Sequence, residues 1–447
     1  MDLGKYVRAI SLFVASAATL IAVAAKSAPS NISTLQFLNG SGVSESISNG
    51  PSHQIDTTGA FFQNLGTNGR TCATCHAPSD NFSITPSHLQ MRFLASGGTD
   101  PVFRSNDGAV CPSADVSTQA ARQQAYSLLL DRGLIRVSMP IPSGANFHLE
   151  SVVDPYNCAT AADMSLYRRP LPSTNLKFLS AVMWDGREPS LASQATDATL
   201  GHAQASQPPT PEQVQQIVDF ESSLYTAQSI DNVAGALNSQ GAKGGPNALG
   251  AQEFYQGIND VLGADPHGNA FNANAFTIFD AWNGVNSPRR ASIARGQAIF
   301  NSRPIAITDV KGLNDTLHVD TLMGTCTTCH DTPNAGNHSV KLPIDIGVAS
   351  FDPDGTQLSY LPQYTFRCDD GTAVATTDPG RAMLSGKCAD LGKFKGPILR
   401  GLQGRAPYFH NGRARTLADA VDFYNQRFSL NLTAQERADL IAFLESL

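Results

Sequence analysis

Two stretches of the chain carry the same pattern of apolar and polar residues. The first opens at Thr210 and includes QVQQIVDFESSL, and the second opens at Thr433 and includes ERADLIAFLESL. Each threonine is followed three residues later by Gln or Glu, the arrangement of a capping box. The apolar residues that follow are in step: Ile217, Val218, Phe220 and Leu224 against Leu440, Ile441, Phe443 and Leu447. The pattern predicts two amphipathic helices that close two copies of one structural unit, the alternative being two unrelated helices that share a cap.

Another pair of helices is predicted ahead of these. Residues 59–65 (GAFFQNL) form a short apolar stretch that suits a short helix. Ser287 can cap a longer helix that Pro288 opens, since proline suits the first helical position. Ile293 and Phe300 lie seven residues apart in that helix and so share one face.

The remaining segments lack a clear helical or strand period. Residues 28–56 are rich in Ser, Asn and Gly and are expected to be loop, and residues 77–170 have the character of a long, turn-rich insertion. Residues 227–286 are rich in Gly, Asn and Ala and are expected to connect two domains, with a helical island near 251–262.

The chain begins with the pattern of an export signal. Lys5 and Arg8 precede an apolar run from Ile10 to Ala25 that ends in small residues. We expect residues 1–27 to be a cleaved signal peptide, and the mature protein to be periplasmic and without stable membrane insertion. An uncleaved anchor is the alternative, because a run of about 16 apolar residues comes close to the length of a bilayer span.

Composition narrows the class of partner. The 447 residues exceed what one core normally organises, which favours two or three domains. Hydrophobic residues make up 41% of the chain, enough for real cores, and charged residues 15%. A formal net charge of −7 argues against nucleic acid or an anionic membrane surface as a partner.

Two short motifs carry the chemistry, CATCH at residues 72–76 and CTTCH at residues 326–330. Cys-x-x-Cys-His is the attachment motif of c-type haem, in which the histidine takes the iron from one side. A dithiol or a zinc site is the alternative, but neither explains a histidine after the second cysteine in both copies. We therefore predict two covalently bound haem c groups. The residues that attach and ligate them are Cys72, Cys75, His76, Cys326, Cys329 and His330.

Four cysteines remain outside these motifs. An even number in an exported protein suggests two structural disulfides. Of the three possible pairings, the one that keeps each bridge within its own domain joins Cys111 to Cys158 and Cys368 to Cys388.

These features predict a mainly α fold with little strand, made of two cytochrome c-like haem domains with loop-rich insertions. The expected division is a signal peptide (1–27), an N-terminal haem domain with a disulfide-held insertion (28–226), an interdomain connection (227–286) and a C-terminal haem domain (287–447).

Four further stretches give the chain a family resemblance: WDGR at 184–187, SLASQA at 190–195, APYFHNG at 406–412 and TLADAVDFY at 416–424. With the two haem motifs in the same order, the chain from about Gly59 onward resembles the bacterial dihaem cytochrome c peroxidase and MauG family. The resemblance implies an N-terminal haem that reacts with peroxide and a C-terminal haem that relays electrons. It also implies that Trp184 lies between the haems and carries an electron or a hole, the alternative being an ordinary buried tryptophan.

Around the first haem, the resemblance implies that the Gln194 amide can hydrogen-bond bound peroxide or water. Ten residues later the family has a proton-transferring glutamate, but this chain has Gln204, and an amide cannot shuttle protons. His202 lies eight residues after Gln194 and, in a helix, on roughly the same side. It can replace the lost carboxylate, ligate the iron, or be a hydrogen-bonded histidine at a loop edge. His88, twelve residues after His76, is another candidate sixth ligand, or a solvated loop histidine.

In the second domain, Thr416 can cap a helix that carries Tyr424 on its apolar face. Peroxidases of the family have a methionine ligand at that position and MauG a tyrosine, so the resemblance implies Tyr424 as a ligand of the second iron. A phenolate ligand favours ferric and higher-valent iron. The alternative is that Tyr424 binds no iron and only fills the core. His410 and Arg400 fit the family's residues around the haem and its propionates, although loop roles at the surface would also explain them.

Family members hold a calcium ion between the domains through an asparagine side chain and backbone carbonyls. The corresponding position in this chain is Arg169, and a cation there opposes calcium. Calcium is therefore not expected, although Pro407 is retained.

Two functions from different classes fit the sequence. In the first, hydrogen peroxide reacts at an open N-terminal haem, and oxidising equivalents pass by Trp184 to the C-terminal haem and on to a donor. That donor is a small c-type cytochrome or cupredoxin, or a protein substrate. In the second, His202 or His88 closes the first iron and the protein is a non-catalytic electron carrier. Spin state and reactivity with peroxide separate the two.

Overall fold

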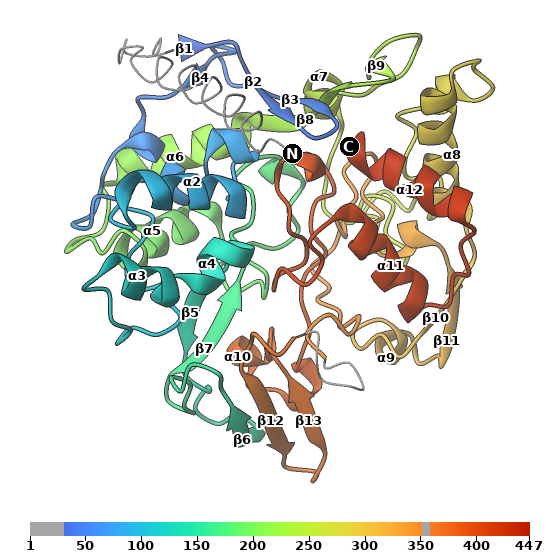
Figure 1. Ribbon diagram of the computed structural model, residues 1–447. Helices are drawn as coiled ribbons and strands as arrows, with labels where there is room; N and C mark the ends of the chain where they lie inside the picture. Colours follow the sequence, from blue (N-terminus) through green and yellow to red (C-terminus); the bar gives the residue numbers. More distant parts are fainter. Residues whose placement is uncertain (1–30, 351–357) are drawn as a thin grey trace, which may run out of the picture.

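The computed structural model describes residues 31–350 and 358–447, so the predicted signal peptide lies outside the described residues. Within them, twelve α-helices outweigh thirteen short strands, in keeping with a mainly α fold (Figure 1). The helices are α1 (Cys72–Cys75), α2 (Pro86–Ser96), α3 (Gln119–Ala125), α4 (Ser127–Arg132), α5 (Leu191–Gly201), α6 (Pro211–Ser223), α7 (Pro246–Ala251), α8 (Pro288–Ser302), α9 (Asn314–Leu317), α10 (Ala382–Ser385), α11 (Leu417–Arg427) and α12 (Ala434–Glu445). The strands are β1 (Asn31–Ile32), β2 (Thr34–Asn39), β3 (Gly42–Ser48), β4 (Ile55–Asp56), β5 (Ile135–Met139), β6 (Phe147–Val153), β7 (Met164–Arg168), β8 (Leu224–Asp231), β9 (Gly235–Ala236), β10 (Ile305–Thr308), β11 (Thr321–Gly324), β12 (Gln363–Cys368) and β13 (Ala373–Thr376).

The internal repeat is visible in matching contacts. Thr210 and Thr433 cap α6 and α12 with the predicted capping boxes. Phe61, from the short 3-10 helix at 60–62, packs on Phe220 of α6 with ring centroids 4.7 Å apart. In the second copy, the ring centroids of Phe300 of α8 and Phe443 of α12 are 5.7 Å apart. Each copy therefore joins an entry helix to a closing helix through an aromatic pair. The helix α8 begins at Pro288 as predicted, but the Ser287 side chain makes no capping hydrogen bond.

Residues 28–56 were expected to be loop, and the described part of that segment forms strands instead. Strands β2 and β3 make an antiparallel hairpin, and β3 pairs with β8 in a four-stranded sheet of order β2-β3-β8-β9. Serines of β3 face inward, and the hydroxyls of Ser46 and Thr226 lie 2.7 Å apart. Hydroxyl pairs let a polar strand be buried, which is why its composition resembled that of a loop.

The insertion at 77–170 is more regular than its sequence suggested. It contains helices α2, α3 and α4 around a core that includes Leu89, Phe93 and Leu129, and a two-stranded sheet of β5 and β7. The disulfide between Cys111 and Cys158 closes it, and Cys368 joins Cys388. The pairing that keeps each bridge within its own half of the chain is confirmed.

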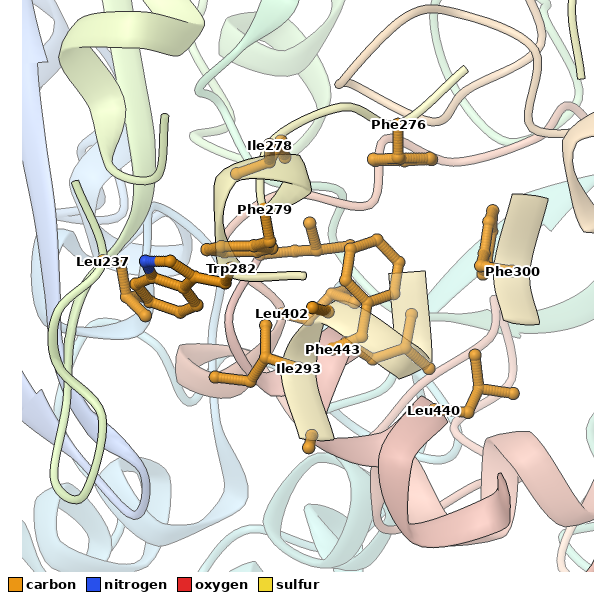
Figure 2. Close-up of a cluster of buried hydrophobic side chains, with 14 of the residues drawn as sticks. Leu237, Phe276, Ile278, Phe279, Trp282, Ile293, Phe300, Leu402, Leu440 and Phe443 are labelled. Atoms are coloured by element: carbon orange, nitrogen blue, oxygen red, sulfur yellow. The ribbon is translucent and has the colours of Figure 1, made fainter. Parts of the chain in front are cut away.

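The two halves of the chain lie side by side, with α2 to α6 in one and α8, α11 and α12 in the other (Figure 1). They are joined below by β6, which pairs with β12 in the sheet β13-β12-β6. In the connection, the helix is α7, which precedes the island predicted near 251–262, where the chain forms turns. The connection also supplies Phe276, Phe279 and Trp282 to the core under α8 and α12 (Figure 2). The exact domain boundaries stay a prediction.

No helix among the described residues has both the length and the apolar character needed to cross a bilayer.

Candidate functional site

The two Cys-x-x-Cys-His motifs have the same local structure. Thr71 precedes α1, and Thr325 precedes a 3-10 turn at Cys326–Thr328. Each threonine exchanges hydrogen bonds with the threonine three residues later, in the manner of a capping box. The four motif cysteines are outside disulfides. Burial raises the pKa of the thiols of Cys72, Cys326 and Cys329 to about 12. It also raises the pKa of the Cys75 thiol.

Both motif histidines are oriented by a backbone carbonyl six residues further on. Nδ1 of His76 lies 3.2 Å from the oxygen of Phe82, and Nδ1 of His330 lies 2.6 Å from the oxygen of Gly336. Because a carbonyl only accepts, Nδ1 carries the proton in each ring and Nε2 is left to bind a metal. Burial lowers the pKa of both imidazoles to about 4, so both are neutral at physiological pH. These are the properties required of an iron ligand.

The first motif faces a cavity that also contains residues of α5. Gln194 and His202 line this cavity together with Cys72, Cys75 and His76. His202 directly follows the last residue of α5 and keeps helical backbone angles, so two residues eight apart lie on the same side, as predicted. The remaining lining is largely apolar and includes Leu65, Val182, Leu191 and Ile217.

A carboxylate that the sequence did not reveal holds His202. Asp107 lies in the loop between α2 and α3, lines the same cavity, and places Oδ2 2.6 Å from Nδ1 of His202. Nη1 of Arg70 donates to the same oxygen at 2.7 Å. Burial alone would raise the pKa of Asp107, but the hydrogen bond to His202 and the charge of Arg70 outweigh it and hold the pKa below its usual value. An ionised carboxylate therefore fixes the imidazole by Nδ1 and leaves Nε2 for a ligand in the cavity.

Two other predicted residues do not line this cavity. The chain turns outward after α5, and the exposed Gln204 accepts a hydrogen bond from Asn68 at 3.1 Å. His88 lies on α2, where its Nδ1 is 2.5 Å from Oδ1 of Asp80. Of the distal candidates named from the sequence, the structure brings Gln194 and His202 together and leaves Gln204 and His88 apart from them.

The second cavity contains the predicted tyrosine. Tyr424 lines it with Cys326, Cys329 and His330. Thr416 caps α11 as predicted, and this helix carries Tyr424 into the cavity. Burial, with a smaller contribution from the neighbouring thiols, raises the pKa of Tyr424 well above its usual range. A phenol in this position ionises when a metal ion takes the place of its proton.

Trp184 lies at the boundary between the two cavities and lines both. Its indole Nε1 donates to the oxygen of Arg169 at 2.8 Å. Its ring meets that of His410 edge-on, with centroids 6.1 Å apart. The ring is thus fixed between the groups of the first motif and those of the second.

Buried cations lie beside both cavities and bear on whether a haem fits. Lys395 and Arg405 each line both cavities and are buried. Burial, with the charge of Arg405, lowers the pKa of Lys395 to about 7. Nε of Arg405 has no hydrogen-bond partner in the described part of the chain. Buried cations without counter-charge are unfavourable, and the propionates of a bound haem would supply the missing carboxylates. The residues present therefore fit a haem in each cavity.

Of the two residues predicted around the second haem, His410 lines the second cavity and Arg400 does not. His410 stacks on Phe394 with ring centroids 3.9 Å apart, and burial lowers its pKa to about 4. Arg400 donates to the oxygens of Leu447 at 3.1 Å and Asn334 at 2.8 Å. These bonds tie Leu447 to the segment after the second motif, while Nη2 of Arg400 has no hydrogen-bond partner among the described residues.

Arg169 stands where the resemblance implies a calcium-binding asparagine. Its guanidinium donates hydrogen bonds to the backbone carbonyls around it. Nη1 donates to the oxygen of Arg132 at 2.9 Å, and Nη2 donates to those of Ile84 at 2.6 Å and Arg405 at 3.0 Å. Burial, with the charge of Arg405, lowers the pKa of Arg169 to about 9, so it stays a cation at neutral pH. Calcium requires six to eight oxygen ligands, and here the carbonyls already bind a fixed positive charge. The residues present do not fit calcium.

A second carboxyl group that we did not predict is Glu221 of α6. It lines the first cavity, is 4% exposed, and Oε2 has no partner among the described residues. Burial raises its pKa to about 7. The sequence held a signal for it, because Glu221 lies four residues after Ile217 and three before Leu224, on the apolar face of the predicted helix. Asp107 had no such signal, since it lies in an irregular loop.

Comparison with known proteins finds sequence similarity to cytochrome-c peroxidases. No family model matches the chain. A cytochrome-c peroxidase of Denitromonas iodatirespirans, IdrP2, is 35% identical over 143 residues, which are 30% of this chain and 38% of that protein. IdrP1 of the same organism, also a cytochrome-c peroxidase, is 30% identical over 192 residues, which are 38% of this chain and 44% of that protein. The chain thus matches less than half the length of each of these relatives.

Among solved structures, a MauG-like protein associated with microbial copper homeostasis aligns over 87% of this chain and 85% of its own, at 15% identity and a TM-score of 0.38. That score is too low to bear on function. The sequence matches to peroxidases agree with the geometry of the site, in which two haem motifs face separate cavities and Trp184 lines both. The sequence matches support the resemblance of this chain to the bacterial dihaem cytochrome c peroxidase and MauG family.

Proposed function

We propose that the protein is a periplasmic oxidoreductase that reduces hydrogen peroxide at the N-terminal haem and receives electrons through Trp184 from the C-terminal haem. The observation that carries this proposal is that Trp184 lines both cavities, one with each haem motif. A haem c bound in each cavity supplies redox-active iron, at which peroxide is reduced in the first and electrons are passed on in the second. The electrons come from a small c-type cytochrome or cupredoxin, or from a protein substrate.

Reducing peroxide to two waters consumes two protons and two electrons, so the first cavity needs a proton donor. His202 is the best-placed group, because it lines that cavity and Asp107 binds its Nδ1. The ionised Asp107 stabilises the imidazolium when Nε2 takes up a proton, and Nε2 then returns the proton to an oxygen in the cavity. Gln194 offers an amide that orients a bound oxygen without exchanging protons. The pair of Asp107 and His202 thus takes over the role that Gln204 cannot perform.

Variants of this pair test the proton relay. Asp107→Asn and His202→Gln should each lower kcat for peroxide reduction by about 10²- to 10³-fold with little change in KM, because general acid–base catalysis contributes factors of this size. Their effects should not add, since the two residues act as one unit. His148→Gln, at an exposed position on β6, serves as the control. Unchanged kcat in both variants would remove the relay from the proposal.

Electron paramagnetic resonance tests the function as a whole. We expect the diferric protein to show a high-spin signal from an open first haem, and one equivalent of peroxide to remove it. Tyr424→Phe should change the low-spin signal of the second haem while leaving the high-spin signal in place, because it removes only the oxygen ligand of the second iron. Trp184→Phe should slow electron delivery between the haems and leave both resting signals unchanged.

A non-catalytic electron carrier is the second candidate, and one observation favours it. Nε2 of His202 is available in the first cavity, and His76 lines the same cavity. An iron bound by both histidines would be six-coordinate and closed to peroxide. Two low-spin signals that do not respond to peroxide, with the first converted to high spin in His202→Gln, would support the carrier and reject the peroxidase.

A further inference from the structure

A cluster of side chains of metal-ligating types lies outside both cavities. Asp331 and His338 belong to the turn that follows the second haem motif, and Asp260 comes from the loop between α7 and α8. One ligand atom from each residue lies within 4.8 Å of the others. The three residues are 1%, 0% and 3% exposed for Asp260, Asp331 and His338 in that order. None of them lines either haem cavity.

Each carboxylate is anchored by one oxygen and leaves the other without a hydrogen-bond partner. Oδ2 of Asp260 accepts from the amide of Ala264 at 2.8 Å, and Oδ1 of Asp331 accepts from the amide of Ser339 at 2.6 Å. The opposite oxygens, Oδ1 of Asp260 and Oδ2 of Asp331, have no partner among the described residues. Metal-binding carboxylates are commonly held in this way, with one oxygen fixed by the protein and the other presented to the ion.

The histidine completes a convergent set. Nδ1 of His338 lies 2.8 Å from Oδ2 of Asp331, but without the geometry of a hydrogen bond, and it too has no partner in the described part of the chain. Ligand atoms about 2.0–2.2 Å from one small cation lie about 3 to 4 Å from each other. The three ligand atoms lie within 4.8 Å of one another, close enough to converge on one cation.

An ion pair between His338 and Asp331 is the simpler explanation, and it does not account for the third residue. It leaves Oδ1 of Asp260 buried and without a partner among the described residues, close to a second carboxyl group, so that any charge on Asp260 would be uncompensated. An uncompensated buried charge costs several kcal/mol. A divalent cation satisfies all three ligand atoms and offsets the charge of both carboxylates.

We propose that Asp260, Asp331 and His338 bind a first-row divalent metal ion, of the class represented by Zn²⁺. Mixed carboxylate and imidazole ligands in a small buried site suit such ions, whereas calcium takes six to eight oxygens. Ser339 is a further candidate donor, because its buried hydroxyl has no partner among the described residues.

The ion would stabilise the turn that orients the second haem ligand. This turn contains Gly336, whose oxygen accepts from Nδ1 of His330. The metal would join it to the loop that carries Asp260. Its removal should lower thermal stability without removing the covalently attached haems.

Metal analysis of the purified holoprotein tests the proposal. The protein is incubated with ZnSO₄, freed of loosely bound ions on a desalting column, and analysed for zinc and iron by mass spectrometry. We expect one zinc for every two irons in the wild type, and a thermal unfolding midpoint that rises by several degrees over chelator-treated protein. X-ray absorption at the zinc edge should show nitrogen and oxygen ligands and no sulfur.

The variants Asp260→Asn and His338→Gln should lose the zinc and the shift in midpoint. Asparagine can still accept from the Ala264 amide through its oxygen, so Asp260→Asn tests the metal ligand more than the fold. Asp320→Asn, exposed in the same half of the chain, should behave as the wild type. Wild-type protein without non-haem metal and without a zinc-dependent shift would overturn the proposal and leave a buried ion pair. Zinc retained equally by wild type and both variants would overturn it as well.

Discussion

Replacing Glu221 by glutamine should stabilise the protein at pH 8 and change it little at pH 4. The carboxyl is 4% exposed beside the first cavity, and its Oε2 has no partner among the described residues. Burial raises its pKa from 4.5 to about 7. While Glu221 is protonated, the native protein carries no buried charge at this position. The native protein is destabilised once the carboxylate forms in the apolar surroundings.

The sign and size follow from proton linkage. Between pH 4.5 and about 7 the native protein holds a proton that the unfolded chain has released. The free energy of unfolding then falls by about 1.4 kcal/mol per pH unit. The stability is complete below the unfolded pKa and is lost as pH rises through the folded pKa, a total of about 3 kcal/mol. Glutamine has no proton to release, so the wild type should fall behind Glu221→Gln by about 3 kcal/mol between pH 4 and pH 8.

Urea unfolding of the holoprotein, followed by far-ultraviolet circular dichroism at several pH values, measures this difference directly. Glu212→Gln is the matched control, because Glu212 lies exposed in the first turn of the same helix. The control should not gain on the wild type as pH rises. If the stability curves of wild type and Glu221→Gln run parallel from pH 4 to pH 8, Glu221 is not a buried neutral acid and the reasoning fails.

Calcium chelation should leave the hydrogen bonds of the Arg169 guanidinium intact, so dialysis against EGTA should not change the visible spectrum. A spectral change that calcium reverses would contradict the conclusion that this guanidinium stands in place of the ion. Phe443→Ala should lower the free energy of unfolding in urea by about 3–5 kcal/mol, because the ring is fully buried against Phe276 and Phe300. A loss below about 1 kcal/mol would mean that the side chain is not packed in a buried core. Thr433→Ala should cost about 1 kcal/mol in the same titration by removing the cap of α12, and no loss would show that the cap is not formed in solution.

The elements that the sequence predicted are those whose signals are local. Helices α6 and α12 were predicted because a capping box and an apolar period lie within about a dozen residues of each other, and the structure has both. Tyr424 and Gln194 reached their cavities for the same reason, since each is carried by a helix that starts at a predicted or recognisable cap. Short-range patterns of this kind fix both the element and the direction of its side chains.

The strands and the carboxylates depended on partners far away in the chain. Strand β3 pairs with β8, which follows it by more than a hundred residues, and the hydroxyl of its inward Ser46 pairs with that of Thr226 on β8. Asp107 gains its role from His202, which reaches it from the end of α5. A polar residue in a loop gives no local indication that it will be buried against a distant side chain, so these features could not be predicted from spacing or composition.

The position of Trp184 depends on Arg169, which stands where the resemblance implies a calcium-binding asparagine. The backbone oxygen of Arg169 accepts the indole N–H, while its guanidinium bonds to carbonyls from both halves of the chain, those of Ile84 and Arg132 on one side and Arg405 on the other. Moving one half relative to the other would break charge-assisted hydrogen bonds that are sheltered from water, which is costly. The same residue therefore joins the halves and orients the ring between the cavities. We therefore expect this geometry to be independent of the free calcium concentration.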